Sequence, residues 1–333
     1  MKISTTLYFD RANQQLGDVQ GELAKTQEQL STGKQIVKPS DSPDKASLVT
    51  RLESELARQA SYQSTLKTVN TRLQASETVL KNTSDVLVRI KEISIQAASD
   101  TLSPADRQSI ALEISSLKDQ MLSLANTQDT NGNYLFSGSR VGSPAFAKDA
   151  KGIVVYQGDQ SRMKVAVGDN RRMNLNMPGA DAFVKIIRDD GKGHKVGLGF
   201  FQAIDDLANA VKNSNHTNMQ RGIAEIDSLQ QGVSDATAQI GTDMNVIDMQ
   251  NSVLDEITLR LKTTKSDAED LDYTSAITKM NKDQLALEAA QSSFAKISQL
   301  SLFKYMNWWA QVFRTQFEYR FEKKLWQQLI PIL

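Results

Sequence analysis

Apolar residues recur in alternating steps of four and three through much of the first hundred residues. The clearest stripe consists of Tyr62, Leu66, Val69, Leu73, Ser76, Leu80, Thr83, Leu87, Ile90, Ser94 and Ala97. Such heptad spacing is typical of a long helix that packs one narrow face on a partner helix. Ser42 before Pro43 suits a helix start, because the missing N–H of proline costs nothing there. The pattern therefore predicts a helix from Pro43 to about Ser99.

Helical spacing also occurs on both sides of this stretch. Before it, a shorter amphipathic segment is interrupted at Gly33, so a first helix should end near Thr32. After it, Ser103 and Pro104 start a third helix that we expect to stop at Asn131 and Gly132. Helical spacing returns at residue 200 and continues, in two further long stripes, to about residue 303.

The middle of the chain has a different period. Between residues 134 and 195, short apolar runs alternate with glycines, which predicts short strands joined as hairpins. The expected fold is therefore mainly α with a β insertion. The N- and C-terminal halves form a long antiparallel helical bundle or coiled coil, and the insertion forms a small middle β domain.

This order of elements divides the chain into four regions. Residues 1–41 and 265–306 are expected to be terminal helices, and residues 42–139 with 199–264 a rod-like helical core that carries a β-hairpin. Residues 140–198 are expected to form a small outward β domain. The remaining residues, 307–333, form an atypical aromatic-rich extension.

The terminal helices are poor in large apolar side chains. Burying one such side chain contributes about 1.5–3 kcal/mol, whereas ordering each residue's backbone costs about 1–2 kcal/mol. We therefore expect both ends to be poorly ordered in the free subunit and to fold when subunits assemble. The predicted assembly interface consists of Leu16, Val19, Leu23, Leu30, Ile277, Met280, Leu287, Phe294 and Ile297.

Composition narrows the possible functions. Lysine plus arginine and aspartate plus glutamate both number 39, so no net charge attracts nucleic acid, and no nucleic-acid partner is expected. The absence of cysteine excludes disulfides and thiolate metal sites. The first sixteen residues lack the apolar run of a cleavable signal peptide, and no stretch is apolar enough to span a membrane.

Four short segments resemble the flagellin-like family, and two of them, Asn131–Ser139 and Tyr156–Asp159, are typical of its hook-associated junction members. They are Gln29–Pro43 (QLSTGKQIVKPSDSP), Asn131–Ser139 (NGNYLFSGS), Tyr156–Asp159 (YQGD) and Gln299–Phe303 (QLSLF). They occur in the family's order, and the resemblance extends over roughly residues 1–306.

The resemblance implies a structural subunit of the bacterial flagellum that joins hook to filament. Its implied partners are the other hook-associated junction protein, flagellin, further copies of itself in a ring of the axial structure, and an export chaperone. It further implies an extracellular location, reached through type III export without a cleavable signal peptide. A heterologous, repeating contact between subunits is what a tubular assembly requires.

Residues 307–333 depart from the family's pattern. All three tryptophans of the chain lie there, and a spacing of four indicates an amphipathic helix through Trp309, Phe313, Phe317, Phe321, Leu325 and Leu329. Three interpretations remain open: a non-native or recently acquired extension, a helix that docks on a partner, and a helix that lies on a membrane surface.

No catalytic, cofactor or metal site is expected, and no small-molecule substrate. The two histidines, His194 and His216, lie in polar loops without a second imidazole at ligand spacing. The Asp189–Gly193 segment lacks the spacing of a phosphate-binding loop and predicts a hairpin turn. Two alternatives to a junction subunit remain: a flagellin-type filament subunit and a cytoplasmic coiled-coil adaptor. An enzyme is a distant third.

Overall fold

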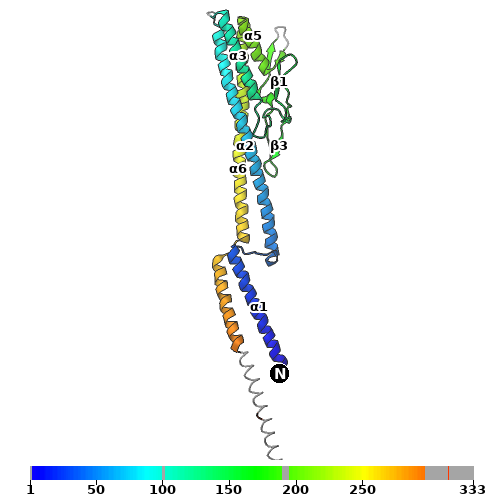
Figure 1. The fold of residues 1–333 in the computed structure, drawn as a ribbon, viewed down its shortest axis with the longest axis vertical. Coiled ribbons are helices and arrows are strands. Elements are labelled where there is room, and N and C mark those ends of the chain that lie inside the picture. Colours follow the sequence, from blue (N-terminus) through cyan, green and yellow to red (C-terminus); the bar gives the residue numbers. More distant parts are fainter. Residues whose placement is uncertain (1, 100–101, 190–194, 297–313, 315–333) are drawn as a thin grey trace, which may run out of the picture. The chain divides into compact units, whose positions relative to one another are not determined.

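Long helices dominate the computed structural model, which describes residues 2–99, 102–189, 195–296 and 314 (Figure 1). The helices are α1 (Lys2–Thr32), η1 (Pro39–Asp41), α2 (Pro43–Ala97), α3 (Pro104–Ala125), α4 (Gly179–Ala182), α5 (Phe200–Lys212) and α6 (His216–Glu269), followed by a helix over residues 273–296. The chain forms two compact units, one from Met1–Glu53 with Lys262–Leu333 and the other from Ser54–Leu261.

In the first unit, α1 and the 273–296 helix lie side by side. Lys279 Nζ pairs with Glu22 Oε2 at 2.6 Å, and the rings of Phe9 and Phe294 meet edge to face with centroids 5.5 Å apart. Residue numbers rise along one helix as they fall along the other, so the pair is antiparallel. The predicted end of the first helix near Thr32 is confirmed.

Two backbone hydrogen bonds, here called the clasp, join the segment after α1 to the segment before the 273–296 helix. The N–H of Gln35 donates to Glu269 O at 2.7 Å, and the N–H of Leu271 donates to Gly33 O at 3.0 Å. Gly33 has φ +69°, and a Cβ there would lie 2.8 Å from the Tyr273 hydroxyl oxygen. Glycine is therefore needed at this position both for its conformation and for the close approach of the tyrosine.

The second unit is built on the antiparallel pair of α2 and α6. Gln63 donates to Asp255 at 2.7 Å, and Lys91 pairs with Asp227 at 2.5 Å. The predicted stripe of α2 is its inner face, because all of its members from Leu66 to Ala97 are buried. Its hydroxyl members donate to the carbonyl four residues before them, as Thr83 does to Val79 O at 2.8 Å, so they are buried with their hydrogen bonds satisfied.

Helix α3 begins as predicted, with the Ser103 hydroxyl accepting from Asp106 N, but it ends earlier than predicted. The expected stop at Asn131 is wrong, because α3 ends at Ala125. The Asn126 side chain forms two hydrogen bonds with the backbone of Phe146, at 2.8 and 2.9 Å. This long-range pairing replaces the next helical turn and directs the chain into the β region.

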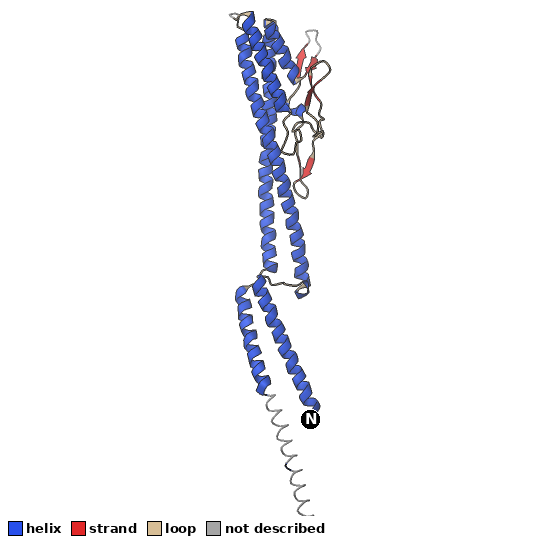
Figure 2. Cartoon of the chain, viewed as in Figure 1, coloured by secondary structure: helices blue, strands red, loops and turns tan. Residues whose placement is uncertain are grey.

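The predicted strands and hairpins are confirmed, and Figure 2 shows them along one flank of the second unit's helices. The described residues form three antiparallel hairpins, each of two strands: β1 (Phe146–Lys148) with β2 (Val154–Tyr156), β3 (Lys164–Ala166) with β4 (Arg172–Asn174), and β5 (Ile186–Asp189) with β6 (Lys195–Leu198). The last confirms the hairpin expected around Asp189–Gly193, whose tip lies outside the described residues.

Aromatic rings join this β region to the helices. Phe146 of β1 and Phe183 lie with their ring centroids 5.2 Å apart, and each also contacts the rings at the start of α5. Those rings are Phe200 and Phe201, 2% and 1% exposed. The β region therefore shares one hydrophobic core with the helices of the second unit. Within the described ranges, no helix is both long and apolar enough to cross a membrane.

Candidate assembly surface

All but one of the residues predicted to form the assembly interface lie on the helix pair of the first unit. Half-buried members on α1 are Leu16, Val19, Leu23 and Leu30, and those on the 273–296 helix are Met280, Leu287 and Phe294. Ile277 is 46% exposed. Ile297 lies outside the described residues. The contact of this surface with another subunit remains a prediction.

The helix pair leaves further apolar side chains on its surface. Leu7 is 51% exposed, Tyr273 52% and Leu285 68%. Among the described side chains of this unit, Leu52 is the only large apolar one that is buried. The unit therefore has almost no core of its own, and burial against another surface would stabilise it.

Leu7, Tyr273 and Leu285 were not among the predicted interface residues. The predicted interface derives from the heptad stripes, which do not include Leu7 or Leu285. Tyr273 begins the last stripe but is not assigned to the interface. Leu285 falls outside the sequence of three, four and seven steps, and only its apolar character in a polar neighbourhood could have identified it.

Ion pairs fix the loop end of this helix pair. Glu269, whose side chain is 10% exposed, pairs with Lys34 and also with Lys265, whose Nζ lies 3.4 Å away. These lysines, Lys34 foremost, hold the pKa of Glu269 below its ordinary value. Lys265 Nζ also pairs with Glu53 at 2.7 Å, so the end of α6 is tied to α2 within the unit.

The segment Gln29–Pro43 folds around the carboxylate of Asp41. This group accepts from the backbone N–H of Lys38 at 2.9 Å and of Val37 at 3.2 Å, and it pairs with Lys25 at 2.9 Å. The Lys38 N–H, followed by Lys25, lowers the pKa of Asp41. The carboxylate therefore closes the turn between α1 and α2 and attaches it to α1.

The segment Asn131–Ser139 is held in the second unit by a buried arginine of α2. Arg72, 8% exposed, lies 2.7 Å from Asp129 Oδ2 and donates to the Tyr134 and Leu135 carbonyls at 3.0 and 3.4 Å. Burial opposes ionisation of Asp129, but the N–H groups of Asn133 and Asn131 outweigh it, and the pKa is lowered. Arg72 thereby fixes the turn that leads from α3 into the β region.

The segment Tyr156–Asp159 closes on the same turn. The Tyr156 hydroxyl donates to Asp159 O at 2.7 Å and accepts from the N–H of Gly179 at 3.2 Å, and burial raises its pKa to about 12. Gly138 has φ +72°, and a Cβ there would lie 2.2 Å from Asp159 Oδ1. Gly138 and Tyr156 of these two segments therefore both contact Asp159, and the three residues form one structural joint.

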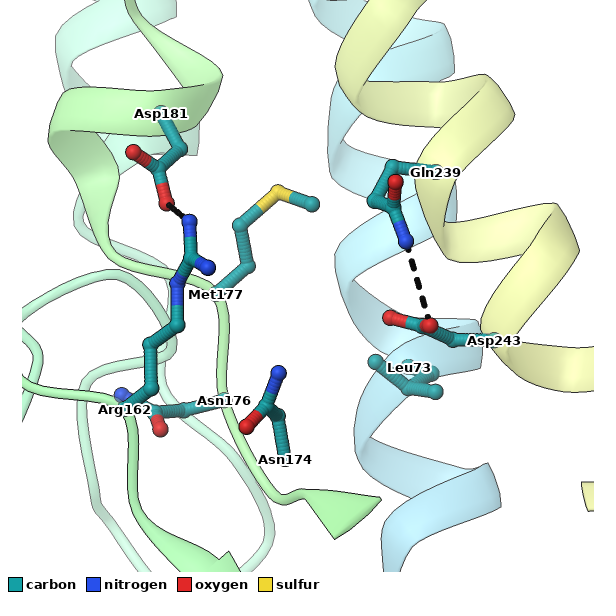
Figure 3. A pocket seen from close by; sticks show the side chains of 8 residues that line it. All are labelled: Leu73, Arg162, Asn174, Asn176, Met177, Asp181, Gln239 and Asp243. Atoms are coloured by element: carbon teal, nitrogen blue, oxygen red, sulfur yellow. Dashed lines mark hydrogen bonds and ion pairs between the residues drawn. The ribbon is translucent and has the colours of Figure 1, made fainter.

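A pocket of about 160 Å³ lies between the β region and the helices of the second unit (Figure 3). Its polar walls pair among themselves, with Arg162 and Asp181 2.7 Å apart on one side and Gln239 donating to Asp243 at 3.2 Å on the other. Burial raises the pKa of Asp243. The walls contain no nucleophile held by a base, which covalent catalysis by an activated nucleophile would require.

The described part of the chain brings no metal-binding group together. Within residues 2–99, 102–189, 195–296 and 314, no cluster of three or more histidine or acidic side chains could hold an ion. His216 has an interaction of its own at the start of α6, and His194 lies outside the described residues. In the described residues, the features that indicate a function are therefore the exposed apolar packing surfaces.

Long terminal helices around a β insertion define a class of protein that sequence comparison also identifies. Residues 3–140 match the bacterial flagellin N-terminal helical region, and residues 223–306 match the bacterial flagellin C-terminal helical region. Together the two regions account for more than half of the chain. The chain belongs to the flagellin family.

Within this family, the chain is similar along most of its length to flagellar hook-associated protein 3. The protein of that name from Escherichia coli K12 is 28% identical over 319 residues, which cover 91% of this chain and 99% of the relative. The one from Salmonella typhimurium is 27% identical over the same shares. A structure of a putative flagellar hook-associated protein from Vibrio parahaemolyticus aligns with a TM-score of 0.61 at 27% identity, covering 69% of this chain and 100% of that one.

Proposed function

We propose that this protein is a structural subunit of the bacterial flagellum that joins the hook to the filament, without catalysis of its own. The observation that carries the proposal is the first unit, in which paired terminal helices leave apolar side chains exposed and bury almost none. Such a unit is suited to repeated contacts between subunits. The similarity to flagellar hook-associated protein 3 supports the proposal that these contacts are made at the junction.

The partners follow from this position. Copies of the chain would pack into a ring through Leu16, Ile277 and their neighbours on the two helices, with the other hook-associated protein on one side and flagellin on the other. An export chaperone would keep the terminal helices apart before assembly, and export would proceed without a cleavable signal peptide. Residues 140–198 would form the outward β domain. Residues 1–41 and 265–306 would order on assembly.

Complementation of a flagellated bacterium that lacks its own junction protein tests the proposal. The full chain should restore attached filaments, whereas Leu16→Asp with Ile277→Asp should leave the subunit folded but filaments absent. Leu112→Asp is the matched control, because Leu112 is 67% exposed on α3 of the second unit. Filaments restored equally by both variants would contradict the assembly surface.

Two alternatives make different predictions. A filament subunit would restore swimming in cells that lack flagellin, and a cytoplasmic adaptor would remain in the cell when the flagellar export apparatus is active. The 28% identity to hook-associated protein 3 exceeds the 23% identity to Flagellin B of Vibrio anguillarum at similar coverage, which favours the junction subunit over the filament subunit. Limited proteolysis of the free chain tests whether the terminal segments are poorly ordered before assembly. Residues 1–41 and 265–306 should then be cut before residues 42–264.

A further inference from the structure

The β3–β4 hairpin presents cations that have no acidic partner. Lys164, Arg171 and Arg172 are exposed, and no carboxylate within the described part of the chain forms an ion pair with any of them. The neighbouring Arg162 differs, because it pairs with Asp181 at 2.7 Å. In a chain whose formal net charge is zero, this hairpin is a local excess of positive charge.

Two of these cations share one face of the hairpin. Arg172 lies opposite Ala166 in the strand register, and Lys164 lies two residues earlier on the same side. The alternate residue Met173 is 8% exposed, so it marks the face that packs on the core. Diagonal neighbours across an antiparallel pair are about 7–8 Å apart, a separation from which two cationic side chains can reach one anionic group.

This cationic face borders an open pocket of about 580 Å³ against α2. Its walls include Tyr62 of α2, Lys164, Arg172 and Asn170. One carboxylate, that of Asp169, also lines the pocket. It accepts from the Tyr62 hydroxyl at 3.1 Å and lies 3.3 Å from Nε of Arg58, a guanidinium that also pairs with Glu55. Neither contact of Asp169 involves Lys164 or Arg172, so these two cations are available to bind an anionic ligand.

We propose that this pocket binds an acidic sugar, with Lys164 and Arg172 holding the carboxylate. The volume lies within the usual range of about 300–1,000 Å³ for small-molecule sites and exceeds what a lone anion fills. Tyr62 offers an aromatic surface, and the Asn170 amide offers both a donor and an acceptor for hydroxyl groups. This combination of two cations, a ring and an amide matches the carboxylate, the apolar ring face and the hydroxyls of a uronic acid. The proposal is independent of the role at the hook.

Ligand titration of the purified full-length chain, followed by NMR or calorimetry, tests the site with D-glucuronate, D-glucose and inorganic phosphate as probes. Glucuronate should bind more tightly than both others and should shift the resonances of Tyr62 and Asn170. Lys164→Gln and Arg172→Gln should each weaken glucuronate binding about tenfold, as expected for the loss of one charge-assisted contact. Raising the ionic strength should weaken it further, because the attraction is screened.

Lys151→Gln is the matched control, since Lys151 is an exposed lysine at the turn of the neighbouring β1–β2 hairpin and does not line the pocket. It should bind glucuronate like the unchanged chain, and circular dichroism should show all variants folded. Glucose binding as tightly as glucuronate would overturn the role of the cations. Phosphate binding as tightly would overturn the sugar, and unchanged affinity in both cation variants would overturn the site.

Discussion

Replacing Arg72 by leucine should destabilise the second unit by much more than the loss of a surface ion pair. The guanidinium is 8% exposed, and its partner carboxylate on Asp129 is 15% exposed. Removing one partner of a buried pair typically costs about 3–5 kcal/mol, because the other charge is left without its counter-ion. Two backbone N–H groups, of Asn131 and Asn133, would still bond Asp129 at 2.8 and 2.9 Å, so we expect the lower end, about 3 kcal/mol.

Urea unfolding followed by far-ultraviolet circular dichroism measures this cost. The control is Arg89→Leu, which removes an exposed pair with Glu113 whose side chains are 53% and 43% exposed, and should cost about 0–1 kcal/mol. A double-mutant cycle of Arg72→Leu with Asp129→Asn isolates the pair, with an expected coupling of at least about 1 kcal/mol. The reasoning fails if Arg72→Leu costs no more than Arg89→Leu, or if the cycle shows no coupling.

Three further predictions concern the joint and the clasp. Gly138→Ala should destabilise the chain by at least about 1 kcal/mol more than Gly132→Ala in thermal unfolding, because both have positive φ but only Gly138 also meets a close neighbour. Stability contributed by Tyr156 should be complete below pH 10 and lost as the pH rises toward about 12, since its folded pKa is raised; a Tyr156→Phe variant should lack this loss in unfolding at alkaline pH. The Glu269 pKa is lowered instead, so its contribution should be present above its ordinary value of 4.5 and disappear as the pH falls below it; hydrogen exchange near the clasp should accelerate there, and Glu269→Gln should remove this pH dependence.

The helices could be predicted from sequence because their cause is local and repeated. Ser42 and Pro43 specify the start of α2, which begins at Pro43 as predicted, and the heptad stripe specifies its buried face, which is the inner face of the helix. The polar members of the stripe can also be buried without an unpaired donor, since the Ser94 hydroxyl donates to the carbonyl of Ile90 in the same helix. Information of this kind needs no knowledge of distant residues.

The features that sequence reasoning missed depend on distant contacts. The end of α3 is set by Asn126 with Phe146, twenty residues later, and the anchoring of the turn by Arg72 with Asp129, 57 residues apart. A polar residue in a helical pattern predicts an exposed position, yet Arg72 is buried because its partner arrives from another element. The cationic pocket beside Tyr62 likewise forms only when the β3–β4 hairpin packs near α2.

The two units should respond differently to mutation. In the second unit, apolar side chains are buried in a core of the chain's own, so core substitutions there should lower the stability of the free subunit. In the first unit, Leu7, Ile277 and Leu285 are exposed, so polar substitutions remove no buried contact from the free subunit. Their cost should appear only where another surface covers them. Polar substitutions at these three positions should therefore give a stable free subunit that cannot assemble. Substitutions in the core of the second unit should not give this phenotype, because they lower the stability of the free subunit itself.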